Sequence, residues 1–247
     1  MTGLGKQAKT LSDTQLKRLL FFVGSETRFP ERNVVIVNLS FRAGLRSKEI
    51  ACLTWDMCVT DGIVGGEDQE LEIRDIASKG KHGGRRIPMN DELKVALTEL
   101  YALEQRKGMD FVPIETDAVE QSTSFQLIDQ RLLSKNADTG TPARGTAKAF
   151  VIALAKGNTD MKSRAASVAF LMNGSNVQQG WYKKLGFAGV TSHSGRRTFL
   201  TKAARMVSSV GGSLADVMEL SGHKQLQNLV RYIDENKDAK RKLVGKM

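Results

Sequence analysis

The side chains best suited to chemistry are concentrated near the C-terminus of this 247-residue chain. The chain has three histidines and three tyrosines, and the stretch 191–233 contains His193, His223 and Tyr232. Arg196 follows His193 by three positions, and Tyr232 follows His223 by nine. Cationic side chains neutralise a phosphate and its transition state, and a phenol is a nucleophile that such cations activate. The pattern therefore indicates chemistry on a phosphate.

The sequence around the first pair predicts a helix that holds them at its N-terminus. Either Ser192 or Ser194 is placed to cap a helix that opens here. His193 and Arg196 would then lie where backbone N–H groups point outward and the helix dipole favours an anion.

Two further helices are predicted to carry the other pair. Ser213 and Asp216 form a capping box, and Gly222 ends the helix that they open. Tyr232 lies about a third of a turn from the centre of the apolar face of the next helix, so it faces sideways, toward whatever His223 faces. That face consists of Leu226, Leu229, Val230 and Ile233.

Each of these features is common by chance when taken alone. A single His-x-x-Arg usually lies on a surface, and a single tyrosine more often packs than reacts. A Gly-His turn is equally unspecific. The combination is more informative, because three separate elements present their polar residues in a fixed order.

That order resembles the catalytic domain of tyrosine recombinases (phage integrases), over roughly residues 11–107 and 165–235. The strings SHSGRRTFLT and LSGHKQLQNLVRYI are both similar to that family. The resemblance implies an earlier arginine in a Gly-Leu-Arg-x-x-Glu turn, and AGLRSKEIACLTW supplies Arg46 and Glu49. It also implies a lysine in a β-hairpin, where IASKGKHGGRRIPM offers Lys79 as the best match and Lys81 as the second.

The expected fold class is α+β and mostly α-helical, a tyrosine-recombinase-like catalytic domain with a small antiparallel three-stranded sheet. The segments MCVTDGIV, QELEIRDIA and RRIPM have the alternation and turn residues of three short strands. Ser12 opens a helix through a capping box, and Asn90 caps one that runs to about Lys107. The pattern of residues 32–42 fits a helix or a buried strand, and the resemblance implies a helix.

The chain divides into a flexible arm at 1–10, a catalytic domain at 11–235 and a charged tail at 236–247. Residues 108–164 are a divergent or inserted segment where the resemblance weakens. Members of the family usually carry a helical core-binding domain before the catalytic one. Either this chain is a piece of a longer protein, or it belongs to the short members, as the fimbrial inverting recombinases do.

The composition is basic, with 37 Lys and Arg against 27 Asp and Glu and a net charge of +10. Such an excess suits DNA or RNA, although charge alone also fits a merely basic protein. Cys52 and Cys58 are expected to be reduced, buried thiols. No apolar run approaches the length of a membrane span, so we expect no membrane partner.

The resemblance implies a reaction in which Arg46 and Arg196 clamp the two non-bridging oxygens of a scissile phosphate. Tyr232 attacks phosphorus, which leaves a 3′-phosphotyrosyl bond and a free 5′-hydroxyl. Lys79 protonates the leaving 5′-oxygen, and His193 gives general acid–base help.

The remaining roles are supporting. His223 donates a hydrogen bond to the phosphate, and Glu49 braces the Arg46 turn. Arg197 stands where many members have another histidine. No metal, cofactor or ATP is expected, because the protein supplies the positive charge. The additional candidates for DNA binding are Lys81, Arg85, Arg86, Arg197 and Lys202.

The expected partner is double-stranded DNA, bound by a homotetramer, with a monomer or weak oligomer when free. We expect the protein to act in the cytoplasm, which is that of a host cell if a phage or mobile element encodes it. Three other functions compete: a type IB topoisomerase-like enzyme or telomere resolvase, an accessory DNA-binding protein without catalysis, and an RNA-binding protein. The last lacks a recognisable aromatic stacking motif, since 6% of residues are aromatic.

Overall fold

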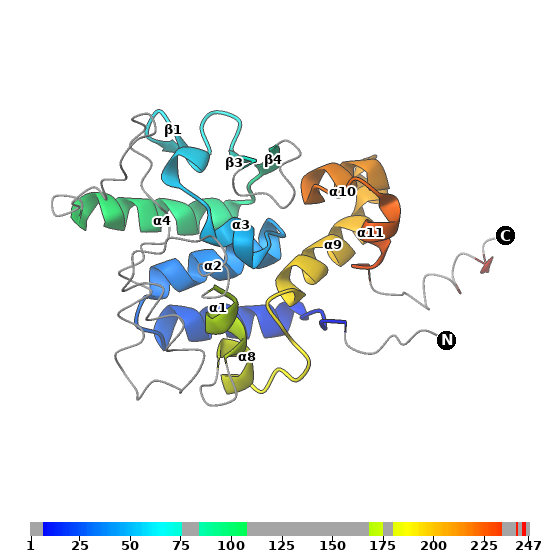
Figure 1. Ribbon diagram of the computed structural model, residues 1–247, viewed down its shortest axis with the longest axis horizontal. Coiled ribbons are helices and arrows are strands. Elements are labelled where there is room, and N and C mark those ends of the chain that lie inside the picture. Colours follow the sequence, from blue (N-terminus) through cyan, green and yellow to red (C-terminus); the bar gives the residue numbers. More distant parts are fainter. Residues whose placement is uncertain are drawn as a thin grey trace.

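The computed structural model describes residues 7–75, 84–107, 168–174, 180–233, 241 and 244–245. These residues form helices and two short antiparallel strand pairs (Figure 1), which confirms the predicted mostly helical α+β fold. The helices are α1 (Asp13–Ser25), α2 (Pro30–Arg42), α3 (Ser47–Ala51), α4 (Asp91–Lys107), α8 (Trp181–Lys184), α9 (Ser194–Met206), α10 (Leu214–Ser221) and α11 (Leu226–Val230). Two 3-10 turns are η1 (Trp55–Met57) and η2 (Val207–Val210), and residues 168–173 are also helical.

Helix α2 is the centre of the fold. It lies between α1 and α4 (Figure 1) and also packs against α9. Consecutive residues on all of its sides are buried, among them Val35, Ile36 and Val37. Polar Asn33 and Asn38 are buried in this helix as well. A helix that is buried on all sides has no separate polar face, which is why the periodicity of this segment did not separate a helix from a buried strand.

The predicted caps of the N-terminal helices are present. The Ser12 hydroxyl accepts from the Gln15 N–H at 3.2 Å, and the Gln15 side chain accepts from the Ser12 N–H at 3.0 Å. The Asn90 side chain accepts from the Leu93 N–H at 3.1 Å. Each cap satisfies a backbone N–H that the first turn of a helix leaves without a partner.

The segment just before α1 is tied to the C-terminal half of the chain. The Lys9 N–H donates to the Gly189 carbonyl at 3.0 Å, and the Leu11 N–H donates to the Thr198 hydroxyl of α9 at 3.0 Å. Residues 7–10 were predicted as part of a flexible arm, and in the structure they pass along the start of α9.

The strands form two antiparallel pairs. β1 (Val59–Thr60) pairs with β2 (Ile63–Val64), and β3 (Glu70–Ile73) pairs with β4 (Arg85–Pro88). In the described residues there are thus two two-stranded sheets, where the sequence predicted one sheet of three strands.

The difference arises in the segment 57–64, which was predicted as a single strand. Asp61 and Gly62 have φ values of 51° and 78°. Positive φ at both central residues is the backbone of a tight type I′ hairpin turn, which reverses the chain after two residues. The hairpin tip with Lys79 and Lys81 lies outside the described residues.

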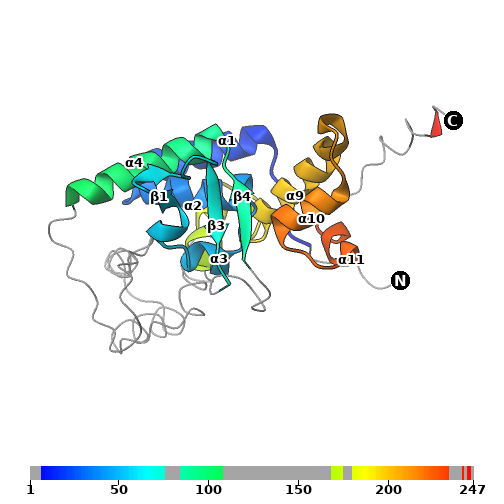
Figure 2. The same cartoon turned by 90° about the horizontal axis from the view of Figure 1, so that it is seen from above.

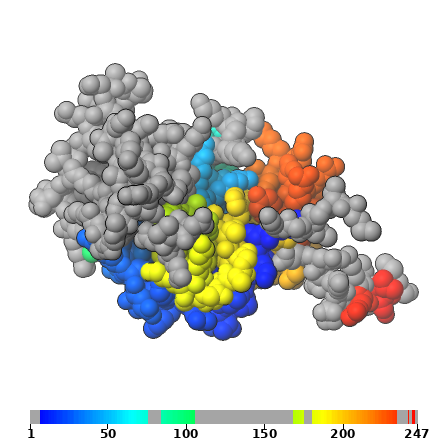
Figure 3. Space-filling view, turned by 60° about the horizontal axis from the view of Figure 1, so that its bottom comes forward, coloured from blue at the N-terminus to red at the C-terminus, as the bar shows by residue number. Residues whose placement is uncertain are grey.

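Helices α9, α10 and α11 form a separate group at one side of the molecule, as Figures 1 and 2 both show. Seen from below, the yellow residues from about 180 to 200 lie between the blue N-terminal part and the orange C-terminal helices (Figure 3). This group has its own small core of Leu200, Val217 and Leu229, with Tyr232 and Ile233 packed against it.

Helix α11 is shorter and less buried than its apolar residues predicted. It ends at Val230, and Leu226 and Val230 are 46% and 52% exposed. Leu229 is the residue of this helix that is fully buried. Gly222, with φ of 67°, ends α10 as expected.

The start of α9 approaches α2 closely because residue 195 is glycine. A Cβ built on Gly195 would lie 2.0 Å from the Ser40 Oγ and 2.9 Å from the Ser40 backbone carbon. No larger side chain fits without displacing one helix from the other. Since the next residue is Arg196, this contact also fixes how deeply that arginine is placed.

We expect Gly195→Ala to lower the free energy of unfolding by about 1–3 kcal/mol, because α9 must move away from α2. Gly24→Ala in α1 is the matched control, since its Cβ would meet Val34 at an ordinary 3.4 Å. Alanine should be neutral there or stabilising by up to about 1 kcal/mol. Urea denaturation of both variants measures the difference, and equal effects would contradict the proposed close contact.

Candidate active site

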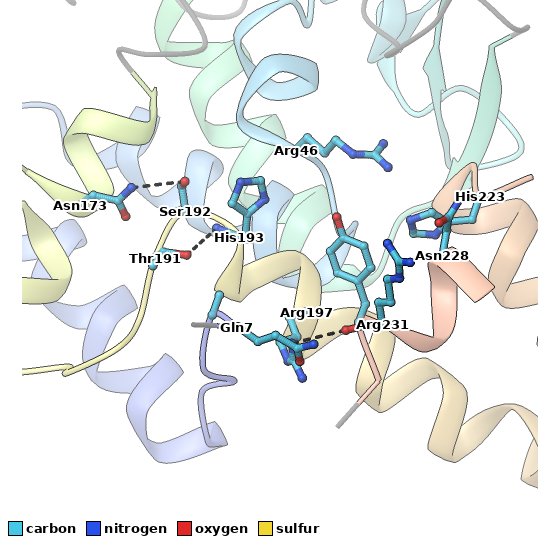
Figure 4. Close-up of a pocket in the computed structure, with 12 residues that line it drawn as sticks. Gln7, Arg46, Asn173, Thr191, Ser192, His193, Arg197, His223, Asn228 and Arg231 are labelled. Carbon is cyan, nitrogen blue, oxygen red and sulfur yellow. Dashed lines mark hydrogen bonds between the residues drawn. The ribbon is translucent and has the colours of Figure 1, made fainter. Parts of the chain in front are cut away.

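A pocket of about 830 Å³ lies where the N-terminus of α9 meets the turns that follow α10 and α11. Arg46, His193, His223 and Tyr232 all line it, although they come from four separate segments of the chain. Figure 4 shows His193 and His223 on opposite sides of this space, with Arg46 between them. The structure thus brings together most of the residues that the sequence singled out.

Arg46 is held by Glu49 through both its backbone and its side chain. The Arg46 N–H donates to Glu49 Oε2 at 2.8 Å, and its Nη1 donates to Glu49 Oε1 at 2.9 Å. Glu49 lies in the first turn of α3, where a carboxylate is favoured by the helix dipole. These contacts are those that a bracing role for Glu49 requires.

Glu49 is also the partner of Arg85 from β4. Arg85 Nη1 and Nη2 each donate to one carboxylate oxygen at 3.1 Å, while Arg85 Nε donates to the Leu220 carbonyl at 3.0 Å. The Arg85 side chain is 9% exposed. It therefore joins β4 to α3 and to the end of α10, an internal position that differs from the DNA contact for which the sequence proposed it.

Arg196 lies beneath the pocket with 1% of its side chain exposed. Its Nη1 donates to the Gly44 carbonyl at 2.7 Å, and its Nη2 donates to the Ser221 carbonyl at 2.6 Å. Its guanidinium carbon is 5.6 Å from the centre of the Tyr232 ring. Burial, together with the charge of Arg46, lowers the pKa of Arg196 to about 10, so it stays charged at neutral pH.

The protonation of Glu49 is decided by these arginines. Burial alone would raise the pKa of its carboxyl. The charges of Arg85, Arg196 and Arg46 outweigh that effect and hold the pKa of Glu49 below its usual value of 4.5. Three guanidinium groups thus share one carboxylate, and the floor of the pocket keeps an excess of positive charge.

His223 and Tyr232 are in contact across the pocket wall. Their ring centres are 5.2 Å apart with a tilt of 43°. The Thr201 hydroxyl donates to the Tyr232 carbonyl at 3.0 Å, and the Tyr232 N–H donates to the Leu229 carbonyl at 2.8 Å. These bonds fix the backbone of Tyr232, which lies after the end of α11, so that its ring lies beside His223.

The charge state of His223 follows from its position. Burial, followed by the positive charges of Arg196, Arg46 and Arg85, lowers the pKa of His223 to about 4. At neutral pH the imidazole is therefore uncharged. Its Nδ1 lies 2.8 Å from the Ser221 Oγ.

His193 is exposed and occupies the N-cap position of α9, which the sequence assigned to Ser192 or Ser194. Its N–H donates to the Thr191 hydroxyl at 3.3 Å. Ser194 is the first residue of the helix, and its hydroxyl accepts from the Thr191 N–H at 2.9 Å. The histidine is thus carried by a tight turn at the helix N-terminus, as expected.

The other candidates differ in where they lie. Arg197 lines the pocket, and its Nη1 donates to the Arg231 carbonyl at 3.5 Å. Arg86 is exposed on β4, whereas Lys202 forms an ion pair with Asp13 beside a different pocket. Lys79 and Lys81 lie outside the described residues.

The described residues contain no group of three or more His, Cys, Asp or Glu side chains placed to hold a metal ion. None of their helices is long and apolar enough to cross a membrane. Cys52 and Cys58 are buried, and neither forms a disulfide.

Sequence reasoning missed two residues of the site, Asn173 and Ser221. Asn173 lines the pocket and its amide donates to the Ser192 hydroxyl at 3.3 Å, yet nothing local in its sequence marks it. Arg85 was named as a candidate, but a strand pattern does not show that its side chain points inward. Ser221 had a signal, since it directly precedes the Gly222-His223 turn.

The model of the phage integrase family matches residues 9–239. No curated protein matches. Among solved structures, XerA recombinase is similar with a TM-score of 0.52 and 18% identity, over 99% of this chain and 66% of that one. The Tn1549 transposon integrase in complex with transposon right end DNA is similar with a TM-score of 0.55 and 17% identity, over 100% of this chain and 68% of that one. The chain thus spans about two thirds of these structures and shares their fold.

We expect Glu49→Gln to lower the free energy of unfolding by about 3–5 kcal/mol at neutral pH, because it leaves buried arginines without their carboxylate. The difference from wild type should be fully present above pH 4.5 and should shrink as the pH falls through the lower pKa of folded Glu49. Denaturant unfolding at several pH values measures this. Glu72→Gln is the control, since Glu72 is exposed and 3.9 Å from Arg74 and should cost less than about 1 kcal/mol. Similar losses in both variants, or a loss that does not depend on pH, would contradict the role given to Glu49.

Proposed function

Because this chain belongs to the phage integrase family, we propose that it is a site-specific tyrosine recombinase that cuts and rejoins double-stranded DNA through a 3′-phosphotyrosine intermediate. The observation that carries the proposal is the meeting of Arg46, His193, His223 and Tyr232 at one pocket, with Arg196 directly beneath. Family membership alone does not make a chain active. This set of side chains supports activity, because it includes a phenol and cationic groups that could bind a phosphate.

The arginines supply the binding site for the scissile phosphate. Arg46 and Arg196 would each donate to a non-bridging oxygen, and a guanidinium fork suits that geometry. Both are already oriented by Glu49 and by backbone carbonyls, so little is lost in ordering them when the phosphate arrives. The positive charge also stabilises the extra negative charge that develops on phosphorus.

Tyr232 is the proposed nucleophile. Its Oη forms a bond to phosphorus while the bond from phosphorus to the 5′-oxygen breaks, so the number of phosphodiester bonds is conserved. The phenol proton leaves as that bond forms, and His193 is the candidate to accept it. The 5′-oxygen leaves as a hydroxyl after taking a proton, and Lys79 is the proposed donor of that proton. Reversal of the same steps with another 5′-hydroxyl rejoins the strand, which is why no ATP is required.

The histidines and the basic surface complete the proposal. His193 is a candidate for acid–base help, and His223 for a hydrogen bond to the phosphate. The partner is proposed to be duplex DNA, held by a homotetramer during recombination. A net charge of +10 and the DNA-bound structure on the same fold support that partner.

We expect Tyr232→Phe to bind DNA as well as wild type but to form no covalent adduct, because the substitution removes only the attacking oxygen. Both proteins are incubated with a pool of nicked duplexes, from which the cleaved end diffuses away, and are analysed on denaturing gels. Tyr101→Phe is the matched control, since it removes a phenol oxygen from α4, away from the pocket.

The outcomes of that experiment separate the proposed functions. An adduct in wild type and Tyr101→Phe but not in Tyr232→Phe supports tyrosine transesterification. An adduct that persists in Tyr232→Phe would move the nucleophile elsewhere. No adduct in wild type, with tight and salt-sensitive binding, would favour an accessory DNA-binding protein.

DNA affinity is expected to fall steeply with salt, because binding to phosphates releases counterions. With about six phosphate contacts the association constant should drop about 10³-fold between 50 and 200 mM salt. Arg86→Ala should reduce the magnitude of the slope of log K against log salt by about one, since Arg86 is exposed and lines a second pocket that Arg46 and His223 also line. Lys202→Ala should leave the slope unchanged, since that ammonium is already paired with Asp13. Fluorescence anisotropy measures both, and a flat response to salt would count against DNA as the partner.

A further inference from the structure

The pocket that Tyr232 lines carries positive charge that no carboxylate in its lining cancels. Three arginines line it, Arg46, Arg197 and Arg231, and of the described residues that line it none is an aspartate or glutamate. Figure 4 shows Arg46 at the top of this space, Arg197 at the bottom and Arg231 on the right. The proposed site for the scissile phosphate uses Arg46 and, beneath the pocket, Arg196. It therefore leaves two arginines of the pocket unused.

A second pocket on the other side of Arg46 has a different charge. It measures about 880 Å³, and it shares Arg46 and His223 with the first pocket but extends toward β3, β4 and α10. Its cations lie among five carboxylate residues, which are Glu49, Glu70, Glu72, Asp216 and Glu219. A polyanion is attracted to the side where positive charge is not cancelled. A DNA strand with a phosphate at Arg46 is therefore expected to continue toward Arg197 and Arg231.

Arg231 is available for such a contact. It is exposed, and no carboxylate of the described residues forms an ion pair with it. Its backbone carbonyl accepts from Arg197 Nη1 at 3.5 Å, so the two arginines belong to one wall of the pocket. Because a guanidinium group offers several N–H donors in one plane, it suits the oxygens of a phosphodiester.

The structure of a DNA strand brings a second phosphate with the first. Phosphates of one strand follow one another at about 3.4 Å along the helix axis. The scissile phosphate is therefore always accompanied by a neighbour one nucleotide away. The guanidinium carbon of Arg196 is 5.6 Å from the centre of the Tyr232 ring, and Arg231 directly precedes Tyr232 in the chain. A pocket of about 830 Å³ with cations on more than one wall thus has both room and charge for two phosphates.

We propose that Arg231, assisted by Arg197, binds the phosphate next to the scissile one in the same strand. This inference rests on the proposed recombinase function. Two consecutive phosphates then hold the strand, one at Arg46 and Arg196 and the other at Arg231. No bond forms or breaks at the second site. Its role is to determine which phosphodiester bond faces the Tyr232 hydroxyl.

Binding at Arg231 also holds the segment that carries the nucleophile. Arg231 and Tyr232 are consecutive, and in the helix before them Leu229 is fully buried while Val230 is 52% exposed. A segment with few buried contacts opens at a low free energy. A phosphate bound by Arg231 connects this segment to the DNA, so the tyrosine is held most firmly when a strand with that neighbouring phosphate is bound.

The first test needs no cleavage and uses two thymidine oligonucleotides as probes. TpT has one phosphodiester, whereas TpTpT has two consecutive ones. In NMR titrations of wild type, TpTpT should bind about 10-fold more tightly than TpT, which is the gain expected from one hydrogen-bonded charged contact. A difference no larger than the statistical advantage of two equivalent diesters would overturn the proposal.

Variants of Arg231 assign that gain to its side chain. Arg231→Ala should lose the preference for TpTpT, whereas Arg231→Lys keeps the charge and should retain most of it. Arg205→Ala is the matched control, since Arg205 is an exposed arginine of α9 that does not line the pocket. All three positions of change are on the surface, so the variants are expected to fold. A preference that persists in Arg231→Ala, or that Arg205→Ala loses to the same extent, would refute the assignment.

Amide hydrogen exchange tests the effect on the tyrosine segment. At equal saturation of wild type, TpTpT should slow exchange of residues 226–233 more than TpT does. Arg231→Ala should show no such difference between the two probes. Equal protection by both probes in wild type would contradict the proposed hold on this segment.

The same contact can be tested during the reaction, with a nicked duplex that traps wild type. An uncharged methylphosphonate replaces the phosphate next to the scissile one, on each side in turn. On one side it should slow adduct formation about 10-fold in wild type, because the charged contact is lost. It should have no further effect in Arg231→Ala, where the contact is already absent. Full effects of the methylphosphonate in both proteins, on both sides, would overturn the proposal.

These experiments separate the second phosphate site from the recombinase function. A preference for TpTpT that depends on Arg231, without an adduct on any duplex, would support the site and count against the recombinase. An adduct in wild type without that preference would support the recombinase and refute the site.

Discussion

The pocket depends on one buried carboxylate. Glu49 receives Arg46 and Arg85 and lies 3.8 Å from Arg196, so residues from α3, β4 and α9 are held at a common point. Without it, guanidinium groups would repel one another in a region of low dielectric. With it, they remain close together and still carry more positive charge than the carboxylate cancels. A site that attracts an anion is thus also a site that holds the two halves of the fold together.

The helices around Glu49 bring the segments that line the pocket close to one another. Helix α2 is buried on every side and supports α9, whose approach is permitted by Gly195. Arg85 then joins the sheet to the end of α10 through the Leu220 carbonyl. The turn with His223 and the turn with Arg46 are consequently fixed by the same side chain.

The sequence predicted the features that depend on interactions between residues close together in the chain. Caps at Ser12, Asn90 and Ser213 are local hydrogen bonds. Helical spacing did not predict that α11 ends at Val230, before Tyr232. The hairpin at Asp61-Gly62 was missed although this dipeptide is a strong turn signal, because the alternation of its neighbours fitted a longer strand. The direction of Arg85 could not be predicted, since it depends on a carboxylate 36 positions away.

The short helix before Tyr232 has a consequence for how the molecule moves. Helix α11 spans Leu226–Val230 and buries Leu229 fully, while Leu226 and Val230 remain about half exposed. A segment with so few buried apolar contacts opens locally at a lower free energy than a helix like α2, whose neighbours surround it. The proposed nucleophile, Tyr232, therefore follows a loosely docked segment, whereas Arg46 and Arg196 are held by Glu49 and by a backbone carbonyl of the rigid part. Local opening of that segment would displace Tyr232 while the charged floor of the pocket keeps its geometry.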